Sequence, residues 1–455
     1  MVAPGLIMAD FQKLNILLYC SRPAESENAG TVIDHIDAFG KYSGHNVLLW
    51  SSMNGLPAED AMAKIDCIVI HYTLSLLYDK YVPADSLDRI RRFPGLKILF
   101  IQDEYRRVNF VCDKIKYAGI DLVFTCAPPE VSRKIYASLE GKVSLSTTLT
   151  GYVPEQLSQV STKPTAERSI DVGYRARKCP FFLGRKSHEK YLIGRRFQER
   201  TKGKGLKCDL SSSEKDRIYG AKWIEFVADC KTTLGTESGA SIIDFTGQIE
   251  YDLNRWQAFR PFAEFEDVPD QLLEQDGEID LQVISPRCFE AAALGTVLVM
   301  YPGTYSGILE PGAHFLQLER NFSNIEEIVE SIRDDRLLSE IAGRARKDLI
   351  DSGKYSYESF VHEFDQSALL LAKEKQWRTV GPSELGEDAF VSLPEPEPAK
   401  PAKSNFLKKL VRKAWKNAPP WIRFLVMVTV FRKSYYSHLY GLKDKYRTQP
   451  PPSRK

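Results

Sequence analysis

The chain has 455 residues, 43% of them hydrophobic and 27% charged, which is enough length for two α/β domains and a composition ordinary for a globular protein. It contains no run of about eighteen apolar residues, so no membrane-spanning helix is expected. The N-terminus reads MVAPGLIMADFQK, with no basic start and no long apolar core. We therefore expect no cleaved signal peptide.

Charge is divided unevenly along the chain. From Lys400 to the end there are fifteen Lys or Arg residues and one acid, Asp444, whereas the remainder holds 47 bases and 59 acids. An acidic body therefore carries a strongly basic tail.

The eight cysteines are expected to be reduced, buried thiols in a cytosolic protein. None belongs to a Cys-x-x-Cys pair, and several fall in apolar, strand-like runs. Both observations argue against disulfides and zinc sites.

The first part of the chain alternates buried strands with helical stretches. A helix is expected around Thr31–Tyr42, and strands at Leu14–Cys20, His45–Trp50, Cys67–Tyr72, Leu96–Ile101 and Leu122–Cys126. Such alternation predicts a doubly wound parallel sheet, and hence a Rossmann-like domain over residues 1–155.

The second part repeats this rhythm after a polar stretch around Gln156–Glu167. Strands are expected at Ser169–Tyr174, Leu206–Leu210 and Thr232–Gly235, and helices at Ser187–Arg200 and Ala221–Cys230. Residues 248–277 are interpreted as an insertion. The fold class is therefore α/β with two Rossmann-like, doubly wound domains, the second over residues 165–380, and a ligand is expected at the carboxyl ends of the strands.

The C-terminal region is expected to be separate from both domains. Residues 381–404 contain LPEPEPAKPAK, which is typical of an extended linker. Residues 405–455 form a basic amphipathic tail, because FLKKLVRKAW places apolar and basic side chains on opposite sides of a helix. Its tryptophans and tyrosines favour the headgroup level of a membrane. We expect the tail to bind an anionic membrane surface, which would hold a cytoplasmic protein at the inner face of the membrane. No nucleic-acid-binding motif appears, so no nucleic-acid partner is expected.

The most informative stretch is Ser285–Gly303, which reads SPRCFEAAALGTVLVMYPG. It predicts a helix that begins at Pro286, a left-handed stop at Gly295, and a buried strand over Thr296–Tyr301.

Arg287 and Glu290 stand three residues apart near the N-terminus of this helix. An arginine beside free backbone N–H groups suits a phosphate, and a carboxylate next to it suits sugar hydroxyls. On these residues alone, a surface salt bridge explains the pair equally well.

The same stretch resembles the C-terminal domain of GT-B glycosyltransferases, in particular the CgeB-like, spore-protein-like group. The pattern comprises Ser285, Arg287, Phe289, Glu290, Ala291, Gly295, Pro302 and Gly303, and the clear resemblance covers Ile284–Phe364. It implies a GT-B glycosyltransferase that binds a nucleotide-sugar donor through Ser285, Arg287 and Glu290. The acceptor would be a hydroxyl of a glycan or lipid-linked molecule, as in polysaccharide biosynthesis.

Two further candidates depend partly on this resemblance. Gly173 and Arg175 follow the first strand of the second domain, where related enzymes face the donor diphosphate; a solvated basic loop is the alternative. Retaining GT-B enzymes often carry two glutamates separated by seven residues, but that register from Glu290 falls on Gln282. Glu237 is the candidate replacement for the missing carboxylate, with an ordinary turn as the alternative.

Asp103 is the candidate base for an acceptor hydroxyl, because it follows the fourth strand of the first domain at its carboxyl end. This role applies if the reaction inverts the sugar configuration; retention would not require it. Glu104 could equally face the cleft. His71 fits a core or rim histidine better.

The sequence also excludes several classes. There is no Gly-rich loop of an NTPase, no Gly-x-Gly-x-x-Gly after the first strand, and no Asp-x-Asp near a strand end. We therefore expect no metal or other cofactor, with Arg287 and Arg175 neutralising the leaving diphosphate. Two alternatives stay open: a nucleotide-sugar epimerase of the same fold, and a catalytically degenerate, membrane-recruited binding protein.

Overall fold

The computed structural model describes residues 13–23, 30–258, 260 and 263–380, together with positions 419, 421, 422, 425 and 429. It divides into two compact units, Met1–Gly247 with Gln275–Val391, and Gln248–Glu274 with Ser392–Lys455. The predicted linker and most of the predicted tail lie outside the described residues. Within the described parts, no helix is long and apolar enough to cross a bilayer.

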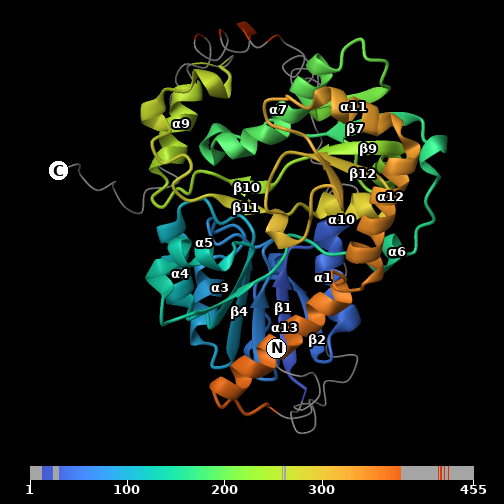
Figure 1. Ribbon diagram of the computed structural model, residues 1–455. Helices are drawn as coiled ribbons and strands as arrows, with labels where there is room; N and C mark the ends of the chain where they lie inside the picture. Colours follow the sequence, from blue (N-terminus) through green and yellow to red (C-terminus); the bar gives the residue numbers. More distant parts are fainter. Residues whose placement is uncertain are drawn as a thin grey trace, which may run out of the picture. The chain divides into compact units, whose positions relative to one another are not determined.

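The first unit contains a six-stranded sheet in the order β2-β1-β3-β4-β5-β6 (Figure 1). All neighbouring strands are parallel. The strands are β1 (Asn15–Cys20), β2 (Asn46–Ser51), β3 (Cys67–Ile70), β4 (Leu96–Ile101), β5 (Leu122–Thr125) and β6 (Ser144–Thr147).

Helices cover both faces of this sheet, which is why its central strands are apolar on both sides. One face packs on α3 (Ala84–Arg92), α4 (Val108–Ala118) and α5 (Pro129–Ile135), and the other on α1 (Gly30–Tyr42). The short α2 (Glu59–Met62) contributes Met62 to the first of these cores.

A second sheet in the same unit has five parallel strands in the order β13-β12-β9-β7-β8. They are β7 (Ile170–Arg175), β8 (Cys208–Ser211), β9 (Cys230–Gly235), β12 (Val297–Met300) and β13 (Phe315–Gln317). One face packs on α7 (Arg185–Arg200), α11 (Ile325–Arg333) and α12 (Asp335–Arg346), and the other on α8 (Ala221–Ala228) and α10 (Pro286–Ala293). The two Rossmann-like sheets predicted from the sequence are therefore confirmed.

Four strands were not predicted. The edge strand β6 reads SLST and is too polar to show as a buried run, and β13 has only three residues. The other two form an antiparallel ribbon of β10 (Ser238–Ala240) and β11 (Leu281–Val283). At Gly239, φ is +124° and a Cβ atom would lie 1.8 Å from the Leu281 carbonyl oxygen, so this pairing requires glycine.

The polar stretch between the two sheets contains α6 (Glu155–Ser158) and is anchored by Arg168. This side chain is only 5% exposed, and its guanidinium donates to the carbonyls of Lys163, Cys230 and Leu294.

In the second unit, the described residues form α9 (Gln248–Ala258) and two short 3-10 turns, where the sequence indicated an insertion without regular pattern.

The last helix of the first unit, α13 (Tyr357–Glu374), returns to the first sheet. It packs on α1, and Phe360 and Phe364 enter the core beneath β1, β3 and β4 (Figure 1). The Asp365 carboxylate accepts hydrogen bonds from Ser43 Oγ and the Gly44 amide at 2.8 and 2.7 Å. The sequence did not predict that this helix, inside the range expected for the second domain, completes the first.

The prediction of free thiols agrees with the structure for all eight cysteines, and the prediction of burial agrees for six of them. All are free thiols, six are buried, Cys179 is partly buried and Cys208 is exposed.

Truncating Phe364 to alanine should lower the free energy of unfolding by about 3–5 kcal/mol, because a fully buried aromatic ring would be replaced by a cavity. Denaturant unfolding measures this. Leu370 lies on the same helix but is 56% exposed, so Leu370→Ala is the matched control and should change stability by less than about 0.5 kcal/mol. Equal effects of the two substitutions would show that α13 does not pack as described.

Candidate active site

A cavity of about 820 Å³ opens at the carboxyl ends of both parallel sheets. Residues that follow β4, β5 and β6 line it from the first sheet, and residues at the ends of β7 and β9 line it from the second. Its volume is in the range of small-molecule sites, and its place is where open α/β sheets bind ligands. The structure therefore has a cavity at the edge where the sequence predicted a ligand to bind.

The two sheets are tied together beside this cavity. Thr150 Oγ1 donates a hydrogen bond of 2.6 Å to the Ile284 carbonyl. A Cβ atom on Gly151 would lie 2.5 Å from Thr31 Cγ2 and 2.9 Å from Pro286 Cγ. Only glycine leaves room here, so the first turns of α1 and α10 approach each other across Gly151.

Helix α10 has the local structure predicted from its sequence. Ser285 is the N-cap and makes no side-chain cap, Pro286 occupies the first turn, and Gly295 has φ +66°. Its apolar side chains pack under the second sheet, so Arg287 and Glu290 are left on the side that lines the cavity. The amides of the first turn therefore face a space in which they have no side-chain cap.

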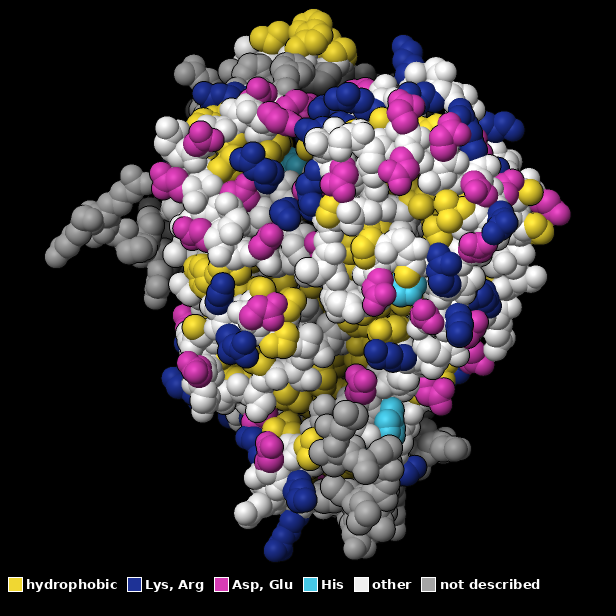
Figure 2. Space-filling view, viewed as in Figure 1, with side chains coloured by type: hydrophobic (Ala, Val, Ile, Leu, Met, Phe, Trp, Pro, Cys, Tyr) yellow, Lys and Arg dark blue, Asp and Glu magenta, His cyan; other side chains and the backbone are white. Residues whose placement is uncertain are grey.

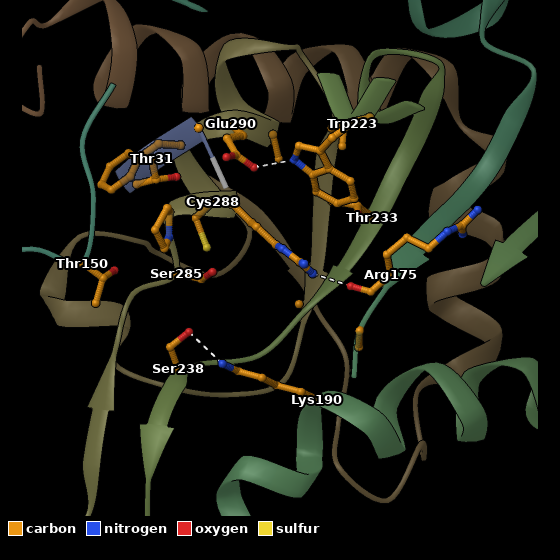
Figure 3. A pocket seen from close by; sticks show the side chains of 18 of the residues that line it. Thr31, Thr150, Arg175, Lys190, Trp223, Thr233, Ser238, Ser285, Cys288 and Glu290 are labelled. Carbon is orange, nitrogen blue, oxygen red and sulfur yellow. Dashed lines mark hydrogen bonds between the residues drawn. The ribbon is translucent and has the colours of Figure 1, made fainter. Parts of the chain in front are cut away.

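Glu290 is partly buried and accepts a hydrogen bond of 2.7 Å from Trp223 Nε1 (Figure 3). Burial raises the pKa of this carboxyl, and the Trp223 hydrogen bond and the charge of Arg287 only partly offset the effect. One carboxylate oxygen is occupied by Trp223. The other is available to a ligand hydroxyl.

Arg287 reaches across the cavity rather than pairing with Glu290. Its guanidinium donates to the Arg175 carbonyl and lies 4.8 Å from the centre of the Trp223 ring. Among the described residues, no carboxylate comes within ion-pair distance of it. The surface salt bridge that the sequence left open is therefore not formed.

Lys190 on α7 was missed by the sequence analysis. Its Nζ donates to Ser238 Oγ at 2.9 Å (Figure 3), and no ion pair with a described carboxylate accompanies this bond. Burial lowers the pKa of the ammonium group, and the positive charges of Arg287 and Arg177 lower it further. Its helical phase was the available signal, because Lys190 is three residues after buried Ser187 and three before buried Ile193.

Arg175 and Gly173 have structural partners of their own. The Arg175 guanidinium forms an ion pair of 2.9 Å with Asp209 and lies 4.3 Å from the centre of the Phe226 ring. In Figure 3 its side chain runs away from the others, so only the start of the residue faces the cavity. Gly173 lies outside the cavity lining, and a Cβ atom there would be 2.2 Å from Cys230 Sγ. This geometry gives neither residue contact with a diphosphate.

Glu237 also points away from the cavity. Its Oε1 accepts hydrogen bonds from the Thr304 amide at 3.0 Å, the Thr304 hydroxyl at 3.0 Å and the Tyr305 amide at 2.8 Å. Tyr305, Ser306 and Gly307 all have positive φ, so the carboxylate holds a left-handed turn. Glu237 therefore shapes the loop after β12, and its neighbours rather than its own side chain line the cavity.

Asp103 lines the cavity from the first sheet, as predicted. It is exposed and accepts a hydrogen bond of 2.7 Å from the Tyr105 hydroxyl. Glu104 is buried instead, with hydrogen bonds from Thr125, Tyr136 and the Cys126 amide, and burial raises its pKa to about 7. It is thus a core residue.

His71 is likewise a core residue. It is fully buried, and its Nε2 lies 3.0 Å from Nδ1 of His35, which is also buried. Burial and the neighbouring ring lower the pKa of His71 well below the usual value, so the pair is neutral.

A third carboxylate of the cavity, Asp34 on α1, was missed by the sequence analysis. The expected helix included this position, but nothing in the local pattern distinguishes it from Asp37 one turn later. Only the approach of α1 to α10 shows that the first of the two faces the cavity.

The charges of the cavity differ from those of the surface. On the face shown in Figure 2, basic and acidic side chains of the described residues are interspersed. In the cavity, the wall on the side of the second sheet has five cations and one carboxylate, Arg175, Arg177, Lys190, Arg217, Arg287 and Glu290, whereas the side of the first sheet has Asp34 and Asp103. One wall thus suits an anion, and the opposite wall suits hydroxyl groups.

Replacing Glu237 with alanine should lower the free energy of unfolding by about 3 kcal/mol, since it leaves buried donors of the Thr304–Tyr305 turn without an acceptor. Glu237→Gln keeps an acceptor oxygen and should cost less. Both are measured by denaturant unfolding. Full stability of Glu237→Ala combined with lost turnover would instead return Glu237 to the catalytic candidates.

No family model matches this sequence, and no curated protein matches it. The structure is similar to an alpha-glucosyltransferase in complex with UDP-glucose and DNA, at 11% identity and a TM-score of 0.49, covering 79% of this chain and all of that one. HepE of Anabaena in complex with UDP follows at 12% identity and 0.45, with 79% of this chain and all of the other covered. A glycosyltransferase from Rickettsia africae matches at 10% identity and 0.45, over 80% of this chain and all of the other. At such identities the likeness concerns the fold.

Proposed function

We propose that the chain is a glycosyltransferase that moves a sugar from a nucleotide-sugar donor to a hydroxyl of a glycan or lipid-linked acceptor. The observation that carries this proposal is the pair of cations in the cavity, Lys190 and Arg287, which have no carboxylate partner among the described residues. Lys190 is partly buried, and keeping its charge there is unfavourable unless an anion lies beside it.

The anion that fits is the diphosphate of a nucleotide sugar. Lys190 and Arg287 approach the same part of the cavity as Ser285, at the uncapped start of α10. Backbone amides and a positive helix end bind phosphate oxygens there, and the two side chains add charge-assisted hydrogen bonds. The same groups would stabilise the diphosphate as it leaves.

Glu290 suits the sugar itself. Trp223 holds its carboxylate in place from one side, and Arg287 lies one turn before it on the same helix. The free oxygen can accept a hydrogen bond from a donor hydroxyl next to the diphosphate.

The similar structures hold UDP or UDP-glucose, and these two molecules are the first probes for the present chain. A thermal-shift panel of nucleoside diphosphates and nucleotide sugars tests the class, because a ligand at a hundred times its dissociation constant adds about 2.7 kcal/mol of stability. Product analysis then separates the alternatives. An isomeric nucleotide sugar without free diphosphate would indicate an epimerase, and binding without turnover would indicate a degenerate site.

Arg287→Ala should weaken the binding of UDP about 10–100-fold, because a charged hydrogen bond to the diphosphate is lost. Lys190→Met should have a similar effect, since it keeps the buried stem and removes only the charge. Titration calorimetry measures both. Arg336→Ala is the control, because its side chain is 88% exposed, and it should bind UDP as the wild type does. Unchanged affinity in both cavity variants would remove the diphosphate from this wall.

Turnover should survive excess EDTA, because protein cations rather than a divalent ion would neutralise the diphosphate. Release of UDP from UDP-glucose is the measurement. Loss of activity with chelator, restored by manganese, would contradict a metal-independent mechanism.

We propose further that the basic tail recruits the enzyme to the inner face of an anionic membrane. A chain ending near Glu395 should stay folded but lose binding to phosphatidylserine vesicles, because each Lys or Arg near such a surface contributes about 1 kcal/mol. Co-sedimentation at low and high salt tests this. Equal pelleting of the full-length and shortened chains would contradict membrane recruitment.

A further inference from the structure

We propose that the reaction inverts the sugar configuration and that Asp34, on the first helix, is the base that accepts the proton of the acceptor hydroxyl, an assignment that rests on the proposed function. The sequence pointed to Asp103 for this role. The structure offers both carboxylates to the cavity, and their surroundings differ.

The position of Asp34 follows from the close contact at Gly151. Thr31 and Pro286 meet there, and each begins a helix whose next turn faces the cavity. Asp34 is three residues after Thr31, and Glu290 is four residues after Pro286, so each lies on the same side of its helix as the contact residue. Asp34 and Glu290 therefore both line the cavity beside this contact, one from each helix, and lie near enough for the charge of Glu290 to act on Asp34.

This space joins the two halves of the expected reaction. Glu290 belongs to the wall that carries Arg287 and Lys190, where the donor would lie. Asp34 belongs to the opposite wall, from which an acceptor hydroxyl would approach the sugar. A base must lie on the acceptor side of the sugar and within hydrogen-bond reach of the attacking oxygen. Asp34 lies on the acceptor side, near the Glu290 carboxylate that would hold the sugar.

The Asp34 carboxylate is also available to accept a hydrogen bond from an incoming hydroxyl. It is partly buried, and no described residue donates a hydrogen bond to its carboxylate. Asp103, by contrast, is exposed and already bonded to the Tyr105 hydroxyl. A group without protein partners can bond an incoming hydroxyl without first breaking another contact.

The groups around Asp34 either raise the pKa of its carboxyl or stay neutral. Burial, the charge of Asp37 on the same helix and the charge of Glu290 on α10 raise the pKa of Asp34 to about 6. The other titratable neighbours are Tyr72 after β3 and Tyr357 on α13, and burial raises the pKa of both phenols, so they stay neutral. The carboxylate is therefore ionised above about pH 6 and protonated below it, and a base of this strength operates near neutral pH.

In the proposed step, the O–H bond of the acceptor breaks and its proton passes to the Asp34 carboxylate. The acceptor oxygen forms a bond to the anomeric carbon. The bond between that carbon and the diphosphate oxygen breaks, and its electron pair leaves with the diphosphate held by Lys190 and Arg287. When water is the acceptor, the same step hydrolyses the donor.

The test uses full-length protein with UDP-glucose as donor and water as acceptor, and calorimetry with UDP as a separate readout. Asp34→Asn should bind UDP within about twofold of the wild type and keep its KM. Its kcat should fall about 10²–10⁴-fold, the contribution of a general base. The wild-type rate should decline as the pH falls below about 6, because the base becomes protonated.

Asp37→Asn is the matched variant one turn further along α1. Asp37 is paired with Arg22 and half-exposed, so its loss should leave turnover at neutral pH unchanged. Removal of its negative charge should move the acidic limb of the pH profile to lower pH. A purely structural role of Asp34 would not produce that displacement.

The outcomes separate the two proposals. Full turnover in Asp34→Asn, or a comparable loss in Asp103→Asn alone, would overturn the assignment of the base while leaving the glycosyltransferase proposal intact. A wild-type protein that binds no member of the nucleotide panel would overturn the proposed function, and the base assignment with it.

Discussion

The close approach of two helices across Gly151 is the contact on which the rest of the site depends. A Cβ atom at this position would collide with Thr31 and Pro286, so the glycine sets how near α1 and α10 can come. That distance in turn decides which side chains share the cavity. Asp34 and Glu290 are on helices that pack on different sheets and stand more than 250 residues apart, yet the charge of Glu290 raises the pKa of Asp34 because of this one contact.

Much of the fold could be predicted because its information is local. Buried parallel strands show as apolar runs, and most of those expected agree with the structure to within one or two residues, as with Leu96–Ile101. The polar edge strand β6 and the three-residue β13 carry no such signal. The return of α13 to the first sheet could not be read from its sequence either, since an apolar helix face does not say which sheet it will cover.

In the candidate site, too, residues marked by a local motif could be predicted and residues placed by tertiary packing could not. Arg287 and Glu290 were identified because cap, helix and strand follow one another within nineteen residues, Ser285–Gly303. Lys190 and Asp34 reach the cavity from helices whose orientation is set by tertiary packing, so no local motif marks them. Glu237 failed as a cavity residue for the opposite reason: its place after a strand was right, but the direction of its side chain is set by the turn at Thr304.

The return of α13 has a consequence for how the chain acquires its structure during synthesis. The first sheet emerges early, but the apolar face between β1 and β4 stays open until residues near Phe364 have been made. Some two hundred residues of the second sheet must be produced in the meantime, with that face exposed to water and to other chains. The first half is therefore not an autonomous folding unit, and gene fragments that stop at the boundary between the sheets would lack the cover of their own core.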